Sequence, residues 1–124
     1  MEYTNEPQNA FQVELKNGSS KVYNHKAMNH SKRMVERFKS MSSGQSVSDV
    51  PEHLKPYKRN SDGVISDRVY DQNNRRMFPG KPCHTIPASF YANFVHPFSH
   101  RNFTAREGAR IQTFPDTFVF KGKP

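Results

Sequence analysis

The chain has 124 residues, only 33% of them apolar, and its 19 Lys and Arg against 11 Asp and Glu give a net charge of +8. Such a short and polar chain buries only a small core, and its single cysteine excludes an internal disulfide framework and a Cys-based zinc site. The positive charge predicts a polyanionic partner. Because no apolar run approaches about 18 residues, we expect no membrane partner.

The first predicted element is a helix over about 29–41, where apolar residues recur at three- and four-residue steps. Asn29 or Ser31 can cap its start. Residues 1–24 show no sustained periodicity, and we expect them to be poorly ordered. The apolar face of the predicted helix consists of Met34, Val35, Phe38 and Met41.

Short strands are the next expectation, after a connector over 45–63 that contains two prolines. The residue types favour a strand or hairpin arm within 64–70. Two further short strands are expected at 84–86 and 90–95.

The last predicted element is a helix over about 105–113. Thr104 and Glu107 have the spacing of a capping box, in which each side chain bonds to the other residue's backbone N–H. Pro115 forbids continuation of the helix. A face of small residues predicts that this helix packs closely against a neighbour.

Two stretches of the C-terminal half resemble DNA (cytosine-5) methyltransferases. The stretch RNFTAREGARIQTFPDTFVFKG is similar to the ninth motif of that family, and Thr85-Ile86 is similar to a Thr-Leu or Thr-Ile pair in its target recognition domain. The resemblance is strong over 75–123 and weak over 1–74. The positions matching the ninth motif are Arg101, Thr104, Arg106, Glu107, Ala109, Arg110, Gln112, Phe114, Pro115, Asp116 and Phe118.

The resemblance implies a fold class and a division of the chain. We expect a small, irregular, mostly-β target recognition domain of α+β class with one or two helices, as a fragment of a two-domain enzyme. Residues 1–24 would begin the recognition region, 25–100 would form the recognition domain, and 101–124 would carry the ninth-motif helix and the start of the return to the catalytic domain.

The resemblance also implies that the chemistry belongs to other parts of the enzyme. The family's catalytic Cys, its S-adenosylmethionine loop and its tenth motif have no counterpart here, so we expect no catalytic residue, no cofactor and no activity in this chain alone. Cys83 follows Pro82, but it lies beside the Thr-Ile pair and is interpreted as a non-catalytic loop residue. The six histidines lack a second ligand at useful spacing, so no metal site is expected.

The expected DNA contacts lie around the Thr-Ile pair. The resemblance places Thr85 against a DNA phosphate, and one of Arg75 and Arg76 is a candidate reader of guanine. The alternative is that both arginines contact only phosphate or solvent. Lys81 and His84 complete the expected set, although exposed loop filler is the alternative for His84.

Outside that set, the mixed aromatic and basic stretch 57–59 also suits a loop that faces DNA. The ninth motif is interpreted as structural, bracing the recognition domain against the catalytic domain. Its expected structural residues are Arg101, Thr104, Arg106, Glu107, Arg110 and Gln112.

Three functions follow as hypotheses. The leading one is the DNA-binding target recognition part of a restriction-modification DNA (cytosine-5) methyltransferase, cytoplasmic in a bacterium or phage, with duplex DNA and the catalytic domain as partners. The second is a complementing, non-catalytic subunit of a split methyltransferase. The third is an unrelated basic nucleic-acid binder whose motif match is accidental.

Overall fold

A computed structural model describes residues 1–55, 58–59, 65–66 and 74–122. The chain divides into two compact units. Unit 1 combines Met1–Ala27 with Phe103–Pro124, and unit 2 is Met28–Asn102. Unit 1 is therefore made from both ends of the chain.

Unit 1 contains two short helices whose ends are capped by side chains. The helix α1 spans Ala10–Lys16, and its N-cap Asn9 accepts a hydrogen bond from the backbone N–H of Gln12 at 2.9 Å. The helix α4 spans Ala105–Ile111 and begins with the predicted capping box. The sequence did not predict α1, because none of its residues is buried and no apolar face marks it.

Unit 2 is organised by α2, which spans Lys32–Lys39, and by a small apolar core. Ser31 caps α2 by accepting from the N–H of Met34 at 3.3 Å, so the predicted helix is confirmed with a later start. The 3-10 helix η1, Glu52–Leu54, packs against α2. The buried core residues are Phe38, Met41, Val50, Leu54 and Val95, with Met34 packed against them.

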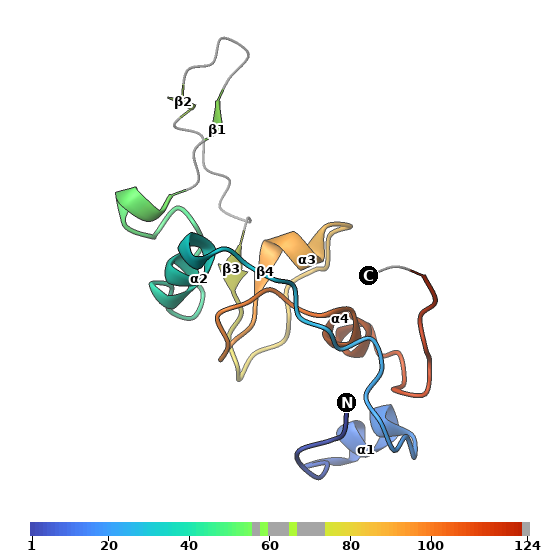
Figure 1. Ribbon diagram of the computed structural model, residues 1–124. Helices are drawn as coiled ribbons and strands as arrows, with labels where there is room; N and C mark the ends of the chain where they lie inside the picture. The colour runs from blue at the N-terminus through green and yellow to red at the C-terminus, as the bar shows by residue number, and fades with distance from the viewer. Residues whose placement is uncertain (56–57, 60–64, 67–73, 123–124) are drawn as a thin grey trace. The chain divides into compact units, whose positions relative to one another are not determined.

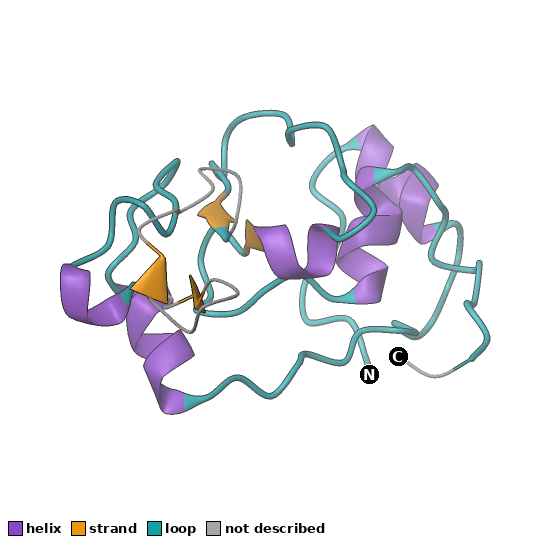
Figure 2. Ribbon diagram, turned by 90° about the horizontal axis from the view of Figure 1, so that it is seen from above, coloured by secondary structure: helices purple, strands orange, loops and turns teal. Residues whose placement is uncertain are grey.

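The described strands are each two residues long and form two separate pairs (Figures 1 and 2). β1 (Lys58–Arg59) pairs antiparallel with β2 (Ile65–Ser66). β3 (Arg75–Arg76) lies parallel to β4 (Phe94–Val95), with Arg75 opposite Phe94. The parallel pair positions the candidate site.

Two of the strand predictions need correction. Residues 84–86 form no strand, and 90–95 is split into the single-turn helix α3 (Phe90–Asn93) followed by β4. The strand predicted within 64–70 coincides with β2 at its start, and its remaining residues lie outside the described part, as does Tyr57. Within the described ranges, no helix has the length and apolar character needed to cross a membrane.

Candidate nucleic-acid interface

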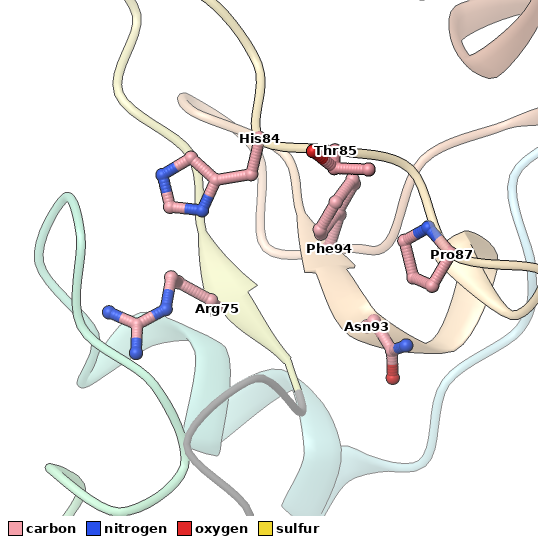
Figure 3. Close-up of a pocket in the computed structure, with 6 residues that line it drawn as sticks. All are labelled: Arg75, His84, Thr85, Pro87, Asn93 and Phe94. Atoms are coloured by element: carbon pink, nitrogen blue, oxygen red, sulfur yellow. The ribbon is translucent and has the colours of Figure 1, made fainter.

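A cavity of about 350 Å³ opens beside the parallel strand pair of unit 2 (Figure 3). The register of β3 against β4 places Arg75 abreast of Phe94, and the loop over 84–87 supplies most of the remaining wall. Three of the five predicted DNA-binding residues therefore meet at one place. The lining residues are Arg75, His84, Thr85, Pro87, Asn93 and Phe94.

Arg75 is held in position by a neighbouring loop. Its Nη1 donates to the carbonyl oxygen of Gly44 at 2.5 Å, and the side chain is half-buried. Gly44 has a φ of +82°, a backbone conformation that favours glycine. A guanidinium carries its N–H donors in a fixed plane, a geometry that suits recognition of phosphate or guanine.

Lys81 lies outside the cavity lining but on the segment that leads into it. Its Nζ sits 4.5 Å from the centre of the Phe78 ring, a cation–π contact. That ring in turn packs against Gly44, where an added Cβ would clash with it. The Phe78 ring therefore positions the exposed ammonium of Lys81. The ring packs against Gly44, whose carbonyl oxygen also accepts the hydrogen bond from Arg75.

His84 and Thr85 present exposed polar side chains to the cavity. In Figure 3, His84 lies on the side of Arg75, and Thr85 lies beside Phe94. Neither side chain makes a hydrogen bond within the described part of the chain. Both are thus placed to donate to an anion or a base edge without breaking an internal contact.

Cys83, immediately before these residues, is half-buried. Burial raises the pKa of its thiol, although a hydrogen bond involving the His84 backbone acts in the opposite direction. A raised pKa disfavours the thiolate that nucleophilic catalysis requires. Among the described residues, no group of three or more His, Cys, Asp or Glu is placed to hold a metal ion.

Arg76 is placed quite differently from its neighbour Arg75. It is 4% exposed, and its guanidinium donates to the carbonyl oxygens of Phe38 and His96, each at 2.6 Å, and of Met41 at 2.9 Å. A further bond reaches the Ser99 carbonyl at 3.1 Å. The guanidinium thus joins the C-terminal end of α2 to the loop after β4, and Arg76, unlike Arg75, does not line the cavity.

The ninth-motif helix α4 is fixed inside unit 1 by a second buried arginine. Arg106 is fully buried and donates to the carbonyl oxygens of Tyr23 at 2.9 Å, Pro115 at 3.1 Å and Phe118 at 2.5 Å. Its own backbone N–H donates to the Asn24 carbonyl at 2.9 Å. One side chain therefore ties α4 to an N-terminal segment and to the stretch that follows the helix.

Nearly the whole chain matches a known protein family. The model of the C-5 cytosine-specific DNA methylase family matches residues 2–124. The chain belongs to this family. The match covers both units, and it excludes the hypothesis of an accidental motif in an unrelated basic protein.

Two relatives of this methylase chain are several times its length. Type II methyltransferase M.DdeI from Desulfomicrobium norvegicum is 52% identical over 122 residues, which cover 98% of this chain and 29% of that protein. Type II methyltransferase M1.HphI from Haemophilus parahaemolyticus is 34% identical over 105 residues, covering 85% of this chain and 25% of that protein. The chain thus spans less than a third of the length of these two relatives.

A third relative is much shorter. Type II methyltransferase M.AquIB from Picosynechococcus sp. is 28% identical over 101 residues, and these cover 82% of this chain and 61% of that protein. This chain thus covers a larger share of M.AquIB than of the two longer relatives.

An arginine of the ninth-motif helix also forms an ion pair with a buried carboxylate. Arg110 donates from Nε and Nη2 to the two carboxylate oxygens of Asp116, at 2.9 and 2.7 Å, and the Tyr3 hydroxyl donates to Asp116 at 2.5 Å. Burial alone would raise the pKa of Asp116, but the hydrogen bonds from Arg110 and Tyr3 outweigh it and hold that pKa below its ordinary value. Asp116 is one of the positions that match the ninth motif, whereas Tyr3 was not singled out from the sequence.

The remaining ninth-motif residues are divided between the units. Thr104 and Glu107 form the capping box at 3.2 and 2.8 Å, and the Thr104 hydroxyl is also bonded to His25 Nδ1 at 2.8 Å. Arg101 belongs to unit 2, where its Nη1 donates to the Asn102 carbonyl at 3.0 Å. Gln112 is the exposed C-cap of α4.

Three cavity-lining residues, Pro87, Asn93 and Phe94, were missed by the sequence reasoning. None carries charge, and none belongs to the ninth motif or to the Thr-Ile pair. Only the fold brings the end of α3 to the same cavity as Arg75 and His84 (Figure 3).

Proposed function

We propose that this chain is the DNA-binding target recognition part of a DNA (cytosine-5) methyltransferase of a restriction-modification system, with an α+β recognition fold. The observation that carries the proposal is the convergence of Arg75, His84 and Thr85 on one open cavity in a family that acts on DNA. Arg75 lies on β3 and Thr85 on the loop over 84–87, so their meeting at one cavity depends on how that loop folds back beside the strand. Lys81 adds a positioned positive charge nearby.

The division of labour follows from the chemistry of the reaction. A base within a stacked duplex cannot be reached at its ring carbons, so enzymes that modify bases rotate the target out of the helix. Holding the duplex in register requires phosphate contacts, whereas reading sequence requires contacts to base edges. We assign the phosphate contacts to Lys81 and Thr85, and the base-edge contact to Arg75.

Catalysis belongs to the rest of the enzyme in this proposal. S-adenosylmethionine would bind there and supply the methyl group, so the isolated chain is expected to bind duplex DNA without modifying it. The ninth-motif helix, fixed by Arg106 and Asp116, would present unit 1 to the catalytic part.

A salt titration of duplex binding tests this proposal. Counterion release predicts that affinity for a 20-bp duplex falls by orders of magnitude between about 50 and 200 mM salt. Lys81→Ala should lower the slope of log affinity against log salt by about one, since one phosphate contact is lost. Lys39→Ala is the matched control, because Lys39 is also exposed but lies on α2 and not on the segment that leads into the cavity. Equal effects of the two variants would contradict the assignment.

A second candidate, a complementing non-catalytic subunit of a split methyltransferase, is favoured by the short relative M.AquIB. The two candidates differ in what happens on mixing. Methyl transfer restored by adding this chain to a separately produced catalytic chain, measured with tritiated S-adenosylmethionine, supports the subunit. Duplex binding without restored transfer supports an excised recognition part.

A further inference from the structure

Asn93 lines the cavity, and its side-chain amide has no role in the contacts assigned above. Asn93 is the last residue of α3 and directly precedes β4, and its side chain is half-buried. Its Nδ2 donates to the Ser89 hydroxyl at 3.0 Å, which is the one hydrogen bond its side chain makes within the described residues. One N–H of the amide and the oxygen Oδ1 therefore remain available.

This free pair of groups matches one base. In the major groove adenine presents N7 as an acceptor and N6–H as a donor, and an asparagine amide meets both at once. Guanine presents two acceptors, N7 and O6, and would oppose Oδ1 with another acceptor. We propose that Asn93 reads an adenine of the target site in the major groove, an inference that rests on the DNA-binding function proposed above.

The surroundings of Asn93 fit an A·T pair. Pro87 lies on the same side of Phe94 as Asn93, whereas Arg75 and His84 lie on the other side (Figure 3). Thymine carries a methyl group on its major-groove edge, and an apolar ring such as that of Pro87 suits contact with it. Phe94 is 4% exposed and fixes the strand that follows Asn93.

A purely structural role is the competing explanation. The bond between Asn93 and Ser89 joins residues four apart across α3, and it stabilises a helix of one turn. Ser89→Ala removes this bond but leaves the amide of Asn93 in the cavity. It is therefore the matched control for Asn93→Ala.

The test is selection from a pool of duplexes with a randomised 8-bp centre, at a salt concentration where the wild-type chain binds. We expect the wild type to select an adenine at one position by about 5- to 150-fold over other bases. Asn93→Ala should lose that preference with an unchanged salt dependence, while Ser89→Ala keeps it. Asn93→Asp should move the preference toward cytosine, whose N4 amino group donates to carboxylates.

A modified base provides a direct check. Replacing the selected adenine by 7-deazaadenine removes the N7 acceptor, so the wild type should bind the modified duplex more weakly than the unmodified one. Asn93→Ala should bind the two duplexes with equal affinity. Sequence selection that is unchanged in Asn93→Ala, equal losses in Asn93→Ala and Ser89→Ala, or a wild type that selects no adenine would each overturn the inference. Absence of any salt-dependent duplex binding by the wild type would instead overturn the proposed function.

Discussion

Arg75 and Arg76 are adjacent in the sequence, yet the same substitution is expected to weaken DNA binding at Arg75 and to lower stability at Arg76. Replacement by methionine keeps much of the side-chain volume and removes the guanidinium. Arg76 bonds to the carbonyl oxygens of Phe38 and Met41 in buried surroundings, and to those of His96 and Ser99 in partly buried ones. Arg75 bonds to the carbonyl oxygen of Gly44 in a partly buried place.

The expected cost at Arg76 follows from the groups it would leave without a donor. A buried acceptor that loses its partner costs about 1–3 kcal/mol. Loss of the donor to both the Phe38 and Met41 carbonyl oxygens therefore predicts that Arg76→Met lowers the free energy of unfolding by about 2–6 kcal/mol. That is a large part of the ~5–15 kcal/mol that stabilises an ordinary domain. For Arg75→Met the same reasoning gives about 1 kcal/mol, since water reaches the Gly44 carbonyl.

Urea unfolding followed by circular dichroism, together with fluorescence anisotropy on a duplex, separates the two roles. Arg76→Met should lower the unfolding midpoint sharply or leave the chain unfolded, and Arg76→Lys should recover only part of the loss because an ammonium has fewer donors. Arg75→Met should unfold near the wild-type midpoint and bind DNA about 5- to 150-fold more weakly. An Arg76→Met chain with wild-type stability and selectively lost DNA affinity would refute this assignment.

Three further predictions concern stability. The pKa of Asp116 is held below its ordinary value of 3.8, so the ionised carboxylate stabilises the fold above that pH, and this stabilisation is lost as the pH falls through the lowered pKa. Asp116→Asn should therefore lower the free energy of unfolding by about 3–5 kcal/mol at pH 7. In urea unfolding, the difference between Asp116→Asn and the wild type should shrink below pH 4. Glu107→Ala should cost about 0.5–2 kcal/mol in the same assay through loss of the capping box, with less loss in Glu107→Gln and unchanged DNA affinity in both; an intact fold with selectively weakened DNA binding would contradict this. Gly44→Ala should cost about 1 kcal/mol or more, because alanine is strained at a φ of +82° and its Cβ displaces the Phe78 ring, and a wild-type midpoint would count against this packing.

The helices that could be predicted from sequence are those specified by their own residues. α2 has an apolar face and a capping serine, and α4 has both residues of a capping box, so local physics suffices. α1 buries none of its residues, and Ser89 makes no capping bond at the start of α3. These two helices carry no periodic signal, and strands of two residues are too short to carry one.

The candidate site was predictable in its basic residues but not in its arrangement. The motif resemblance indicated the segment around Thr85, and charge indicated the arginines. Successive residues of a strand point to opposite faces, so only one residue of the pair Arg75-Arg76 faces the cavity. Which one does depends on the pairing of β3 with β4, a tertiary fact. Asn93 had no signal at all, because an uncharged amide becomes informative only when its neighbours are known.

Arg76 and Arg106, two of the buried arginines, show how so polar a chain can be folded at all. Short helices and two-residue strands leave many backbone carbonyl groups without a partner inside regular structure, and each buried one needs a donor. A guanidinium offers five N–H donors in one plane, so a single side chain can serve several loops at once. Arg76 does this in unit 2 and Arg106 does it in unit 1. Part of the positive charge carried by the 19 Lys and Arg is therefore used inside the fold.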